Sequence, residues 1–251
     1  MRGLFVTGTD TGVGKSIVSA SICAALAARG ERVAAFKPAV TGLDGDPGDW
    51  GHDHELLAAS ASAGQSPEEV SPHRFGPATS PHLAAELSGA AIEPEQLLAA
   101  ASSAAAGADA LVVEGVGGLL VPLSTGYLIR DLAIDLGLAV VVVARPGLGT
   151  INHTLLTVEA ARIAGLVVAG VVMTPWAQRP TQVEVSNRDT VERLTGTAVS
   201  VLGPTDRATL ASAGRALPLD TWLAVGGGGH RAAAEPVAVR AELEMLAAHP
   251  G

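Results

Sequence analysis

The chain has 251 residues, of which 48% are hydrophobic but only 3% aromatic, and its formal net charge is −9. This length suits one large α/β domain or two small ones, and the acidic balance argues against a nucleic-acid partner, which needs a basic footprint. No apolar stretch reaches the ~18–20 residues of a membrane span, the N-terminus lacks a signal-peptide pattern, and the single cysteine, Cys23, has no disulfide partner. We therefore expect a cytoplasmic protein that neither spans nor binds a membrane.

Short apolar runs alternate with Ala-rich segments of helical spacing. The runs expected as buried strands are Leu4–Val6, Val33–Phe36, Ala110–Val113, Ala139–Ala144, Val167–Met173 and Val199–Leu202. The segments expected as helices are Lys15–Ala28, Pro94–Ala106, Leu128–Leu136, Asn152–Ala164 and Val183–Leu194. This alternation predicts a doubly wound, mainly parallel sheet with helices on both faces, a three-layer α/β/α fold. Ligands of such sheets bind beyond the carboxyl ends of the strands, so we expect the chemistry in the turns that follow them.

The domain organisation is predicted to be simple. Residues 1–225 show no composition break and are expected to form a single domain, in which Leu43–Gly51, rich in Gly and Asp, is a loop. The run Gly226–Gly229 is typical of a flexible joint. Beyond it, Pro236–Ala248 is expected to form one amphipathic helix, which either docks on the domain or is a loosely attached tail.

The first strand is followed by a phosphate-binding loop, GTDTGVGKS, from Gly8 to Ser16. A Gly-rich turn between a buried strand and a helix is the context that a P-loop requires. We expect the backbone of Gly12–Gly14 (Gly12, Val13 and Gly14) and the helix start to surround the phosphates. Lys15 would reach the β- and γ-phosphates, and the Ser16 hydroxyl would ligate Mg²⁺.

The loop is one residue longer than the common form, because Thr9 stands where the first glycine is expected. This longer loop is typical of one branch of the P-loop proteins, whose ParA and MinD-like members carry a signature lysine at the position of Asp10. The absence of that lysine argues against a partitioning ATPase.

Lys15 and Lys37 are the only lysines in the chain, and the other fourteen of its sixteen cationic residues are arginines. Because arginine supplies the ordinary surface charge, these two positions are expected to need a compact ammonium group for a chemical reason. Lys37 follows the second strand, from which it can point toward a phosphate bound at the loop.

The segment Val6 to Ser16 resembles the phosphate loop of the dethiobiotin synthetase family, and further motifs of that family follow in the same order. They are Phe36-Lys37-Pro38 with Thr41-Gly42, Thr79-Ser80-Pro81-His82, Val113-Glu114-Gly115-Val116-Gly117-Gly118 and Leu148-Gly149-Thr150-Ile151-Asn152-His153. The resemblance implies a Mg²⁺-dependent ligase of biotin biosynthesis that converts 7,8-diaminononanoate, CO₂ and a nucleoside triphosphate to dethiobiotin, nucleoside diphosphate and phosphate. It also implies a carbamate, a carbamic–phosphoric anhydride and a homodimer with sites at the subunit interface.

The resemblance assigns roles to individual residues. Lys37, Lys15 and Thr11 would be catalytic, facing the carbamate and the γ-phosphate. Ser16, Asp53 and Glu114 match the residues on the metal side, and Glu114 also lies beside the phosphates. The residues that would hold the diamine and its carboxylate are Thr41, Ser80, Gly117, Gly149, Thr150, Ile151 and Asn152, the last four from the neighbouring subunit. Free N–H groups at a helix start, such as Gly149–Asn152, bind anions.

Two questions stay open in the sequence. The family's adenine-reading Asn-Asp pair is replaced by Thr174-Pro175, and a threonine cannot offer an amide's paired donor and acceptor. The base pocket, in which we also place Pro204, is therefore compatible with ATP, CTP or broad use. The spacing of His52 and His54 allows a zinc site as well as solvated histidines.

Two other functions are alternatives to the ligase. The first is a ParA/MinD-like switch ATPase, which Asp10 and the acidic charge oppose. The second is a cobyrinate-type amide synthetase, but residues 203–251 are too few for its glutaminase domain and include no second cysteine.

Overall fold

The computed structural model describes residues 2–226. Its strands are β1 (Gly3–Gly8), β2 (Val33–Phe36), β3 (Ala39–Val40), β4 (His73–Arg74), β5 (Ala110–Gly118), β6 (Pro122–Ser124), β7 (Tyr127–Leu128), β8 (Ala139–Ala144), β9 (Val168–Met173) and β10 (Val199–Val201). Its helices are α1 (Lys15–Ala27), the 3₁₀ helix η1 (Gly48–Trp50), α2 (Asp53–Ser60), α3 (Pro67–Val70), α4 (Pro81–Leu87), α5 (Pro94–Ala105), α6 (Ile129–Leu136), α7 (Thr150–Ile163), α8 (Gln182–Thr195), α9 (Leu210–Arg215) and α10 (Leu219–Gly226). None of the helices in this part of the chain is long and apolar enough to cross a membrane.

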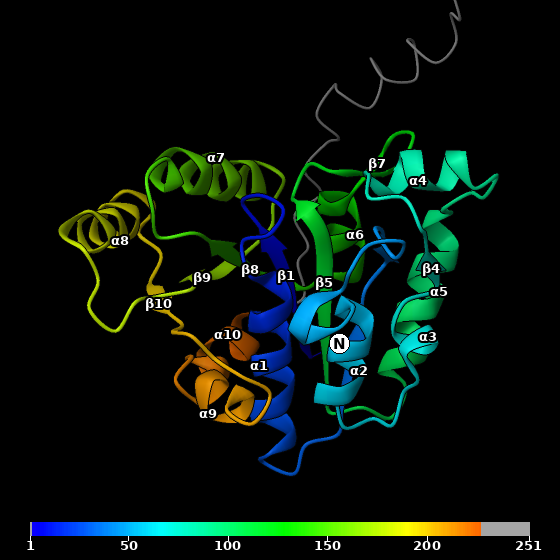
Figure 1. The fold of residues 1–251 in the computed structure, drawn as a ribbon, viewed down its shortest axis with the longest axis horizontal. Coiled ribbons are helices and arrows are strands. Elements are labelled where there is room, and N and C mark those ends of the chain that lie inside the picture. The colour runs from blue at the N-terminus through cyan, green and yellow to red at the C-terminus, as the bar shows by residue number, and fades with distance from the viewer. Residues whose placement is uncertain (1, 227–251) are drawn as a thin grey trace, which may run out of the picture.

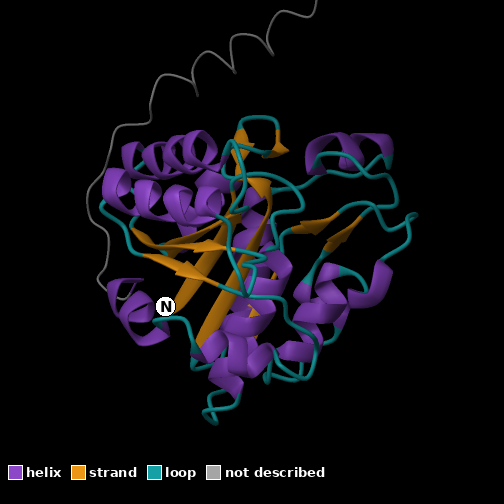
Figure 2. Cartoon of the chain, turned by 60° about the vertical axis from the view of Figure 1, so that its left-hand side comes forward, coloured by secondary structure: helices purple, strands orange, loops and turns teal. Residues whose placement is uncertain are grey.

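A six-stranded sheet forms the centre of the molecule, in the order β10-β9-β8-β1-β5-β2, and each neighbouring pair is parallel (Figure 1). Helices cover both of its faces (Figure 2). The predicted three-layer α/β/α fold is thereby confirmed.

Successive strand residues pack into two different cores. In β1, Phe5 faces a core shared with α5, α6, α7 and α8, whereas Leu4 and Val6 face a core shared with α1 and α10. All three side chains are completely buried. A parallel sheet that is covered on both faces needs apolar residues at every position, which explains why its strands read as continuous apolar runs.

The chain order of the sheet places the candidate site. β1 lies between β5 and β8, and the chain reverses its direction of travel across the sheet at this point. Ligands of open α/β sheets bind at such a switch point, beyond the carboxyl ends of the strands. The phosphate loop leaves β1 at this position, and β5, which carries Glu114, lies directly beside it.

Several expected boundaries were wrong. β5 does not turn after Val113 but continues to Gly118, because its pairing with β1 extends from Gly3↔Leu111 to Gly8↔Gly118. Glu114 is therefore an interior strand residue. The helix expected to begin at Asn152 begins at Thr150. Gly226, expected as part of a flexible joint, is the last residue of α10.

The other differences concern short elements. The loop expected at Leu43–Gly51 contains η1, and α2, α3, α4, α9 and α10 had no counterpart among the expected helices. The predicted joint beyond Gly226 and the predicted tail helix lie outside the described residues.

Candidate active site

The phosphate loop has the backbone shape that its glycines allow. Gly14, the residue before α1, has a φ of 93°, and a Cβ built on it would lie 2.7 Å from Cγ2 of Thr174. A side chain at this position would therefore be strained and would collide with its neighbour. No side chain caps the start of α1 and no acidic residue lies in its first turn, so this helix end presents its positive dipole to the cavity.

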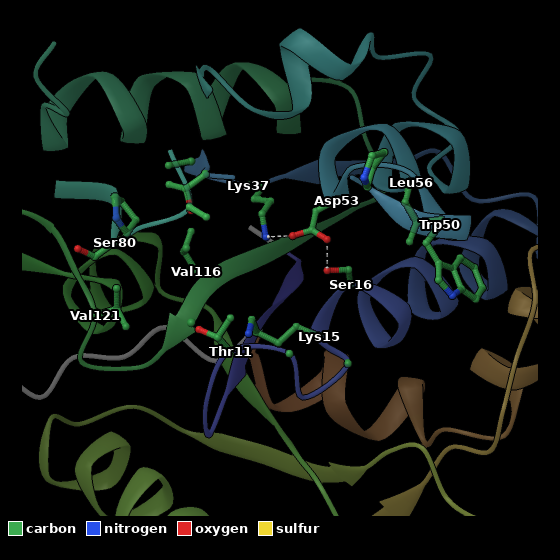
Figure 3. Close-up of a pocket in the computed structure, with 18 of the residues that line it drawn as sticks. Thr11, Lys15, Ser16, Lys37, Trp50, Asp53, Leu56, Ser80, Val116 and Val121 are labelled. Atoms are coloured by element: carbon green, nitrogen blue, oxygen red, sulfur yellow. Dashed lines mark hydrogen bonds and ion pairs between the residues drawn. The ribbon is translucent and has the colours of Figure 1, made fainter. Parts of the chain in front are cut away.

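Four side chains form a charged cluster beneath the loop, in which Lys37 and Glu114 are buried and Ser16 and Asp53 are partly exposed. Lys37 Nζ lies 2.5 Å from Glu114 Oε1 and 3.0 Å from Asp53 Oδ2. Ser16 Oγ lies 2.7 Å from Asp53 Oδ1 and 2.9 Å from Glu114 Oε1. The cluster joins α1, β5, the end of β2 and the start of α2, so it forms only when these four parts of the chain have come together (Figure 3).

The two lysines have opposite electrostatic environments. Burial alone would lower the pKa of Lys37, but the carboxylates of Asp53 and Glu114 outweigh it and raise that pKa above its usual value. Burial and the nearby charge of Lys37 instead lower the pKa of Lys15 to about 8. Within residues 2–226, the one hydrogen bond that Lys15 Nζ donates goes to the carbonyl oxygen of Asp10, at 3.0 Å. Lys15 therefore carries the ammonium that a bound phosphate would stabilise most.

Burial would raise the pKa of Asp53, but the Lys37 ammonium and the Ser16 hydroxyl lower it to about 2. Asp53 is therefore ionised at any pH near neutrality, as a cation ligand must be.

The cluster fits a divalent cation. Glu114 is completely buried, and its Oε2 has no hydrogen-bond partner within the described part of the chain. A buried carboxylate oxygen without a partner is costly, and a cation would satisfy it. Two carboxylates and a hydroxyl beside a phosphate loop are the oxygen ligands that Mg²⁺ takes in nucleotide enzymes.

A cavity of about 700 Å³ opens above this cluster. It contains most of the predicted site residues, including the catalytic candidates and the three substrate candidates nearest to them: Thr11, Gly12, Gly14, Lys15, Ser16, Lys37, Thr41, Asp53, Ser80 and Gly117. Gly117 lies close to the loop, since a Cβ built on it would lie 3.5 Å from Thr11 Oγ1. Residues as far apart in the chain as Thr11 and Gly117 thus meet around one cavity.

Other predicted site residues lie outside the cavity lining. Val13 belongs to the core. Gly149 and Asn152 are exposed at the start of α7. Thr150 is buried, and its hydroxyl oxygen lies 3.3 Å from the hydroxyl oxygen of Thr154. Thr174 is only 3% exposed and packs behind Gly14.

Pro175 and Pro204, which were predicted to line the base pocket, lie on neighbouring segments. The N–H of Trp176, one residue after Pro175, donates to the carbonyl of Leu202 at 2.8 Å, two residues before Pro204. The two loops that follow β9 and β10 are thereby held together.

Two features of the site were missed by the sequence analysis. Arg145 Nη2 lies 2.7 Å from Asp10 Oδ2 and 3.4 Å from the carbonyl oxygen of Thr11, so it holds the outer side of the phosphate loop. Trp50 lines the cavity, and Arg207 lies over its ring. Arg145 directly follows a predicted strand, and Trp50 is one of only three tryptophans, so both carried a signal that could have been used.

The histidine pair shows no ligand geometry of its own. The ring centroids of His52 and His54 are 6.0 Å apart, and burial lowers the pKa of His54. Within residues 2–226, no group of three His, Cys, Asp or Glu side chains gathers that could hold a metal ion. The candidate magnesium site uses a hydroxyl and two carboxylates instead.

Comparison with known proteins gives consistent matches. A family model described as an AAA domain matches residues 2–209. The ATP-dependent dethiobiotin synthetase of Anaeromyxobacter dehalogenans (strain 2CP-1) is 47% identical over 174 residues, 69% of this chain and 76% of that protein. The enzyme of the same name from Bacillus subtilis (strain 168) is 37% identical over 207 residues, 82% of this chain and 88% of that protein.

Solved structures match in fold alone. A ParA family ATPase from Chlorobium tepidum has a TM-score of 0.51 at 15% identity, with both chains fully covered. A MinC:MinD cell division complex from Aquifex aeolicus has a TM-score of 0.52 at 14% identity and covers 92% of this chain and 98% of that one. At this level of identity, these matches show a similar fold and give no information about the residues of the site.

Proposed function

Because the chain belongs to the dethiobiotin synthetase family, we propose that its cavity forms the cyclic urea of dethiobiotin from 7,8-diaminononanoate, CO₂ and a nucleoside triphosphate. The activity is that of a nucleotide-dependent ligase in biotin biosynthesis. The observation that carries the assignment to this cavity is that Lys37, Asp53, Glu114 and Ser16 meet directly beside the phosphate loop.

The reaction divides into three steps. One amine of the diamine attacks CO₂ and loses a proton, giving a carbamate. A carbamate oxygen attacks the γ-phosphorus as the bond to the nucleoside diphosphate breaks, giving a carbamic–phosphoric anhydride. The second amine then attacks the carbonyl carbon and phosphate leaves, which closes the ring.

The loop side of the cavity binds the phosphates. Phosphoryl transfer is accelerated mainly by positioning and by neutralising charge on the transferring group. Lys15 and the start of α1 supply positive charge at the β- and γ-phosphates, and Thr11 lies beside them in the cavity lining. The pKa of Lys15 is low because its ammonium is buried and no carboxylate among the described residues forms an ion pair with it. A bound phosphate would supply the negative charge that stabilises it.

Lys37 acts from the opposite side. In the structure its ammonium is bound by two carboxylates, which keep it protonated. We propose that its ammonium points toward the carbamate and the γ-phosphate, where its positive charge balances the negative charge that develops during phosphoryl transfer. Thr41, Ser80 and Gly117 form the wall on this side, which we assign to the diamine.

Ser16, Asp53 and Glu114 would hold Mg²⁺. Bound there, the ion would neutralise charge on the phosphate oxygens. The orphaned Oε2 of Glu114 is the structural support for this assignment.

We further propose a homodimer in which Gly149–Asn152 of one copy binds the diamine carboxylate in the other. The cavity does not include this helix start, although it belongs to one of the matched motifs. Apolar side chains nearby are exposed: Leu148 is 98% exposed, and Leu156 on α7 and Leu120 before β6 are each more than half exposed. A cytoplasmic location stays a prediction.

The test is an isotope assay with labelled bicarbonate, 7,8-diaminononanoate, Mg²⁺ and each nucleoside triphosphate in turn. We expect label in a cyclic urea that resists acid, together with one phosphate released per ring. Release of phosphate without diamine, stimulated by DNA or lipid vesicles, would instead support the ParA/MinD-like switch ATPase.

A further inference from the structure

The cavity has two chemically different ends on either side of the phosphate loop. Ser80 and Val121 lie at one end, and Trp50 and Leu56 lie at the other, with the charged groups of the cluster between them (Figure 3). The first end carries the hydroxyls assigned to the diamine, whereas the second is lined by Ile17, Trp50 and Leu56.

This arrangement fixes the direction of the nucleotide. The γ-phosphate has to face the diamine end, because the carbamate attacks it there. The α-phosphate and the nucleoside therefore extend away from that end, along α1 past Ser16 and Ile17. Trp50 is the aromatic side chain that lines the cavity in this direction.

Trp50 is held in a fixed position by three helices. It packs on a small apolar cluster of Ala20, Leu56 and Leu210, which belong to α1, α2 and α9. Part of its surface stays accessible. An indole that is anchored on one side and open on the other is a rigid surface on which a flat ligand can stack.

Arg207 fixes the indole from the loop that follows β10. The central carbon of its guanidinium lies 5.9 Å from the centroid of the Trp50 ring, and its Nη2 donates a hydrogen bond to the Trp50 carbonyl. A Cβ built on Gly51 would lie 3.4 Å from that same nitrogen, so Arg207 closes tightly over residues 50 and 51. The contact between Trp50 and Arg207 joins the segment just before α2 to the loop after β10, in which Pro204 lies.

We propose that Trp50 is the surface on which the nucleobase stacks, and that Arg207 is a positioning residue that holds Trp50 in place. This inference deepens the proposed function and rests on it for the direction of the nucleotide. Every base offers a π-face, so stacking gives affinity with little dependence on base identity. With Thr174 packed behind Gly14, the site selects bases by stacking area, and purine nucleotides bind ahead of pyrimidine nucleotides without excluding them.

The decisive experiment measures direct binding by calorimetry, with ADP, CDP and inorganic tripolyphosphate as probes. For Trp50→Ala we expect about tenfold weaker binding of ADP, a smaller loss for CDP and no change for tripolyphosphate, which has no base. Trp50→Phe should restore most of the ADP affinity. In the assay of ring closure, Trp50→Ala should raise KM for ATP about tenfold with kcat nearly unchanged.

The chain provides a matched control. Arg188 lies over Trp176 in a second cation–π pair, 5.7 Å from the guanidinium carbon to the ring centroid, and Trp176 is not in the cavity lining. Arg188→Ala, which removes the cation of this second pair, should leave all three affinities unchanged. Arg207→Ala should weaken ADP binding about threefold, again without affecting tripolyphosphate, because it loosens Trp50 alone.

Two results would overturn the proposal: unchanged ADP affinity in Trp50→Ala, or an equal loss for ADP and tripolyphosphate, which would mean that the loop itself had been damaged. Because these measurements need neither diamine nor CO₂, they remain readable if ring closure fails. A failure of the ligase assay in the wild-type chain would contradict the proposed function, whereas a failure of the probe comparison would contradict only the stacking surface.

Discussion

Two ion-paired groups hold the phosphate loop, one from beneath and one from its rim, and they differ mainly in exposure. Beneath the loop, Lys37 is 3% exposed and Glu114 is completely buried, with 2.5 Å between Nζ and Oε1. On the rim, Arg145 and Asp10 are 56% and 53% exposed, with 2.7 Å between their closest atoms. Distances alone would rank the two as equals.

Their surroundings rank them differently. Water screens the rim pair, so it contributes little, whereas breaking a buried pair leaves a charge that cannot be solvated. The buried pair also contacts the partly exposed side chains of Ser16 and Asp53, so these four residues share partners and are not independent. We therefore expect substitutions beneath the loop to affect both chemistry and stability, and substitutions on the rim to affect neither strongly.

The largest effect is expected for Lys37→Met. Loss of its charge should lower kcat for ring closure by about 10²–10³-fold, because a preorganised charge at the transferring phosphate is removed. The same change leaves Glu114 buried without its counter-ion and should cost about 3–5 kcal/mol of unfolding free energy, measured by denaturant titration.

The double variant Lys37→Met/Glu114→Gln separates the two effects. It should recover most of the lost stability but none of the activity, since no completely buried charge is left unpaired, and the carboxylate of Asp53, whose side chain is 44% exposed, can be solvated by water. Recovery of activity in the double variant would show that Lys37 has only a structural role.

Asp53→Asn should raise the Mg²⁺ concentration needed for half-maximal activity by roughly tenfold or more. The amide keeps the shape of the side chain but removes the negative charge that favours the cation. Activity is measured against Mg²⁺ concentration at saturating nucleotide. The matched control is Glu55→Gln, two residues after Asp53 in α2 and outside the cavity lining. It should leave the Mg²⁺ requirement unchanged.

Nucleotide affinity should fall as pH rises above about 8, by up to about tenfold per pH unit. The pKa of Lys15 is lowered to about 8 in the free protein, and bound phosphates favour its charged form and raise that pKa. Binding therefore takes up a proton above pH 8, which calorimetry in buffers of different ionisation enthalpy detects as proton uptake. Lys15→Arg stays charged over this range and should bind without that dependence.

The same pKa has a consequence for the nucleotide-free protein. Below about pH 8 the ammonium of Lys15 is charged in both the folded and the unfolded state, and its burial lowers the stability of the fold by a constant amount. Between about pH 8 and 10.5, the ordinary pKa of a lysine, the unfolded state binds more protons, so this contribution to stability rises with pH. The Lys15→Met variant should lack that rise in thermal unfolding.

The smallest effect is expected for Arg145→Gln, with less than about 1 kcal/mol of unfolding free energy lost because both partners are more than half exposed. KM for the nucleotide should change by less than about threefold, and added salt should reduce even that difference. A loss as large as that of Lys37→Met would contradict the comparison between the buried and the rim pair.

The sequence motifs place several side chains of the cavity better than they place the elements around it. Thr11, Lys37, Thr41 and Ser80 line one cavity, because each follows a strand or precedes a helix. Their roles in that cavity stay predictions. The length of β5 was missed, since Glu114-Gly115-Val116-Gly117-Gly118 has the composition of a turn. It belongs to the strand because β1 pairs with Glu114 and again with Gly118, across an irregularity that contains Gly117 with a φ of 62°.

The roles of Trp50 and Arg145 could not be derived from local patterns. Trp50 lies in a loop rich in Gly and Asp, and what makes it part of the cavity is its packing against Leu56 and Leu210. Arg145 meets Asp10 across 135 residues of chain.

What the sequence by itself determined is the layer order and the chemistry that the molecule can perform. Continuous apolar runs require a sheet covered on both faces, and a Gly-rich loop with Lys15 and Ser16 requires phosphate, whatever the rest of the chain does. The tertiary structure alone decided which charges pair. Lys37 and Glu114 lie 77 residues apart, and their contact is strong because the packing of several segments together excludes water from it. The same packing leaves Oε2 of Glu114 without a hydrogen-bond partner among the described residues.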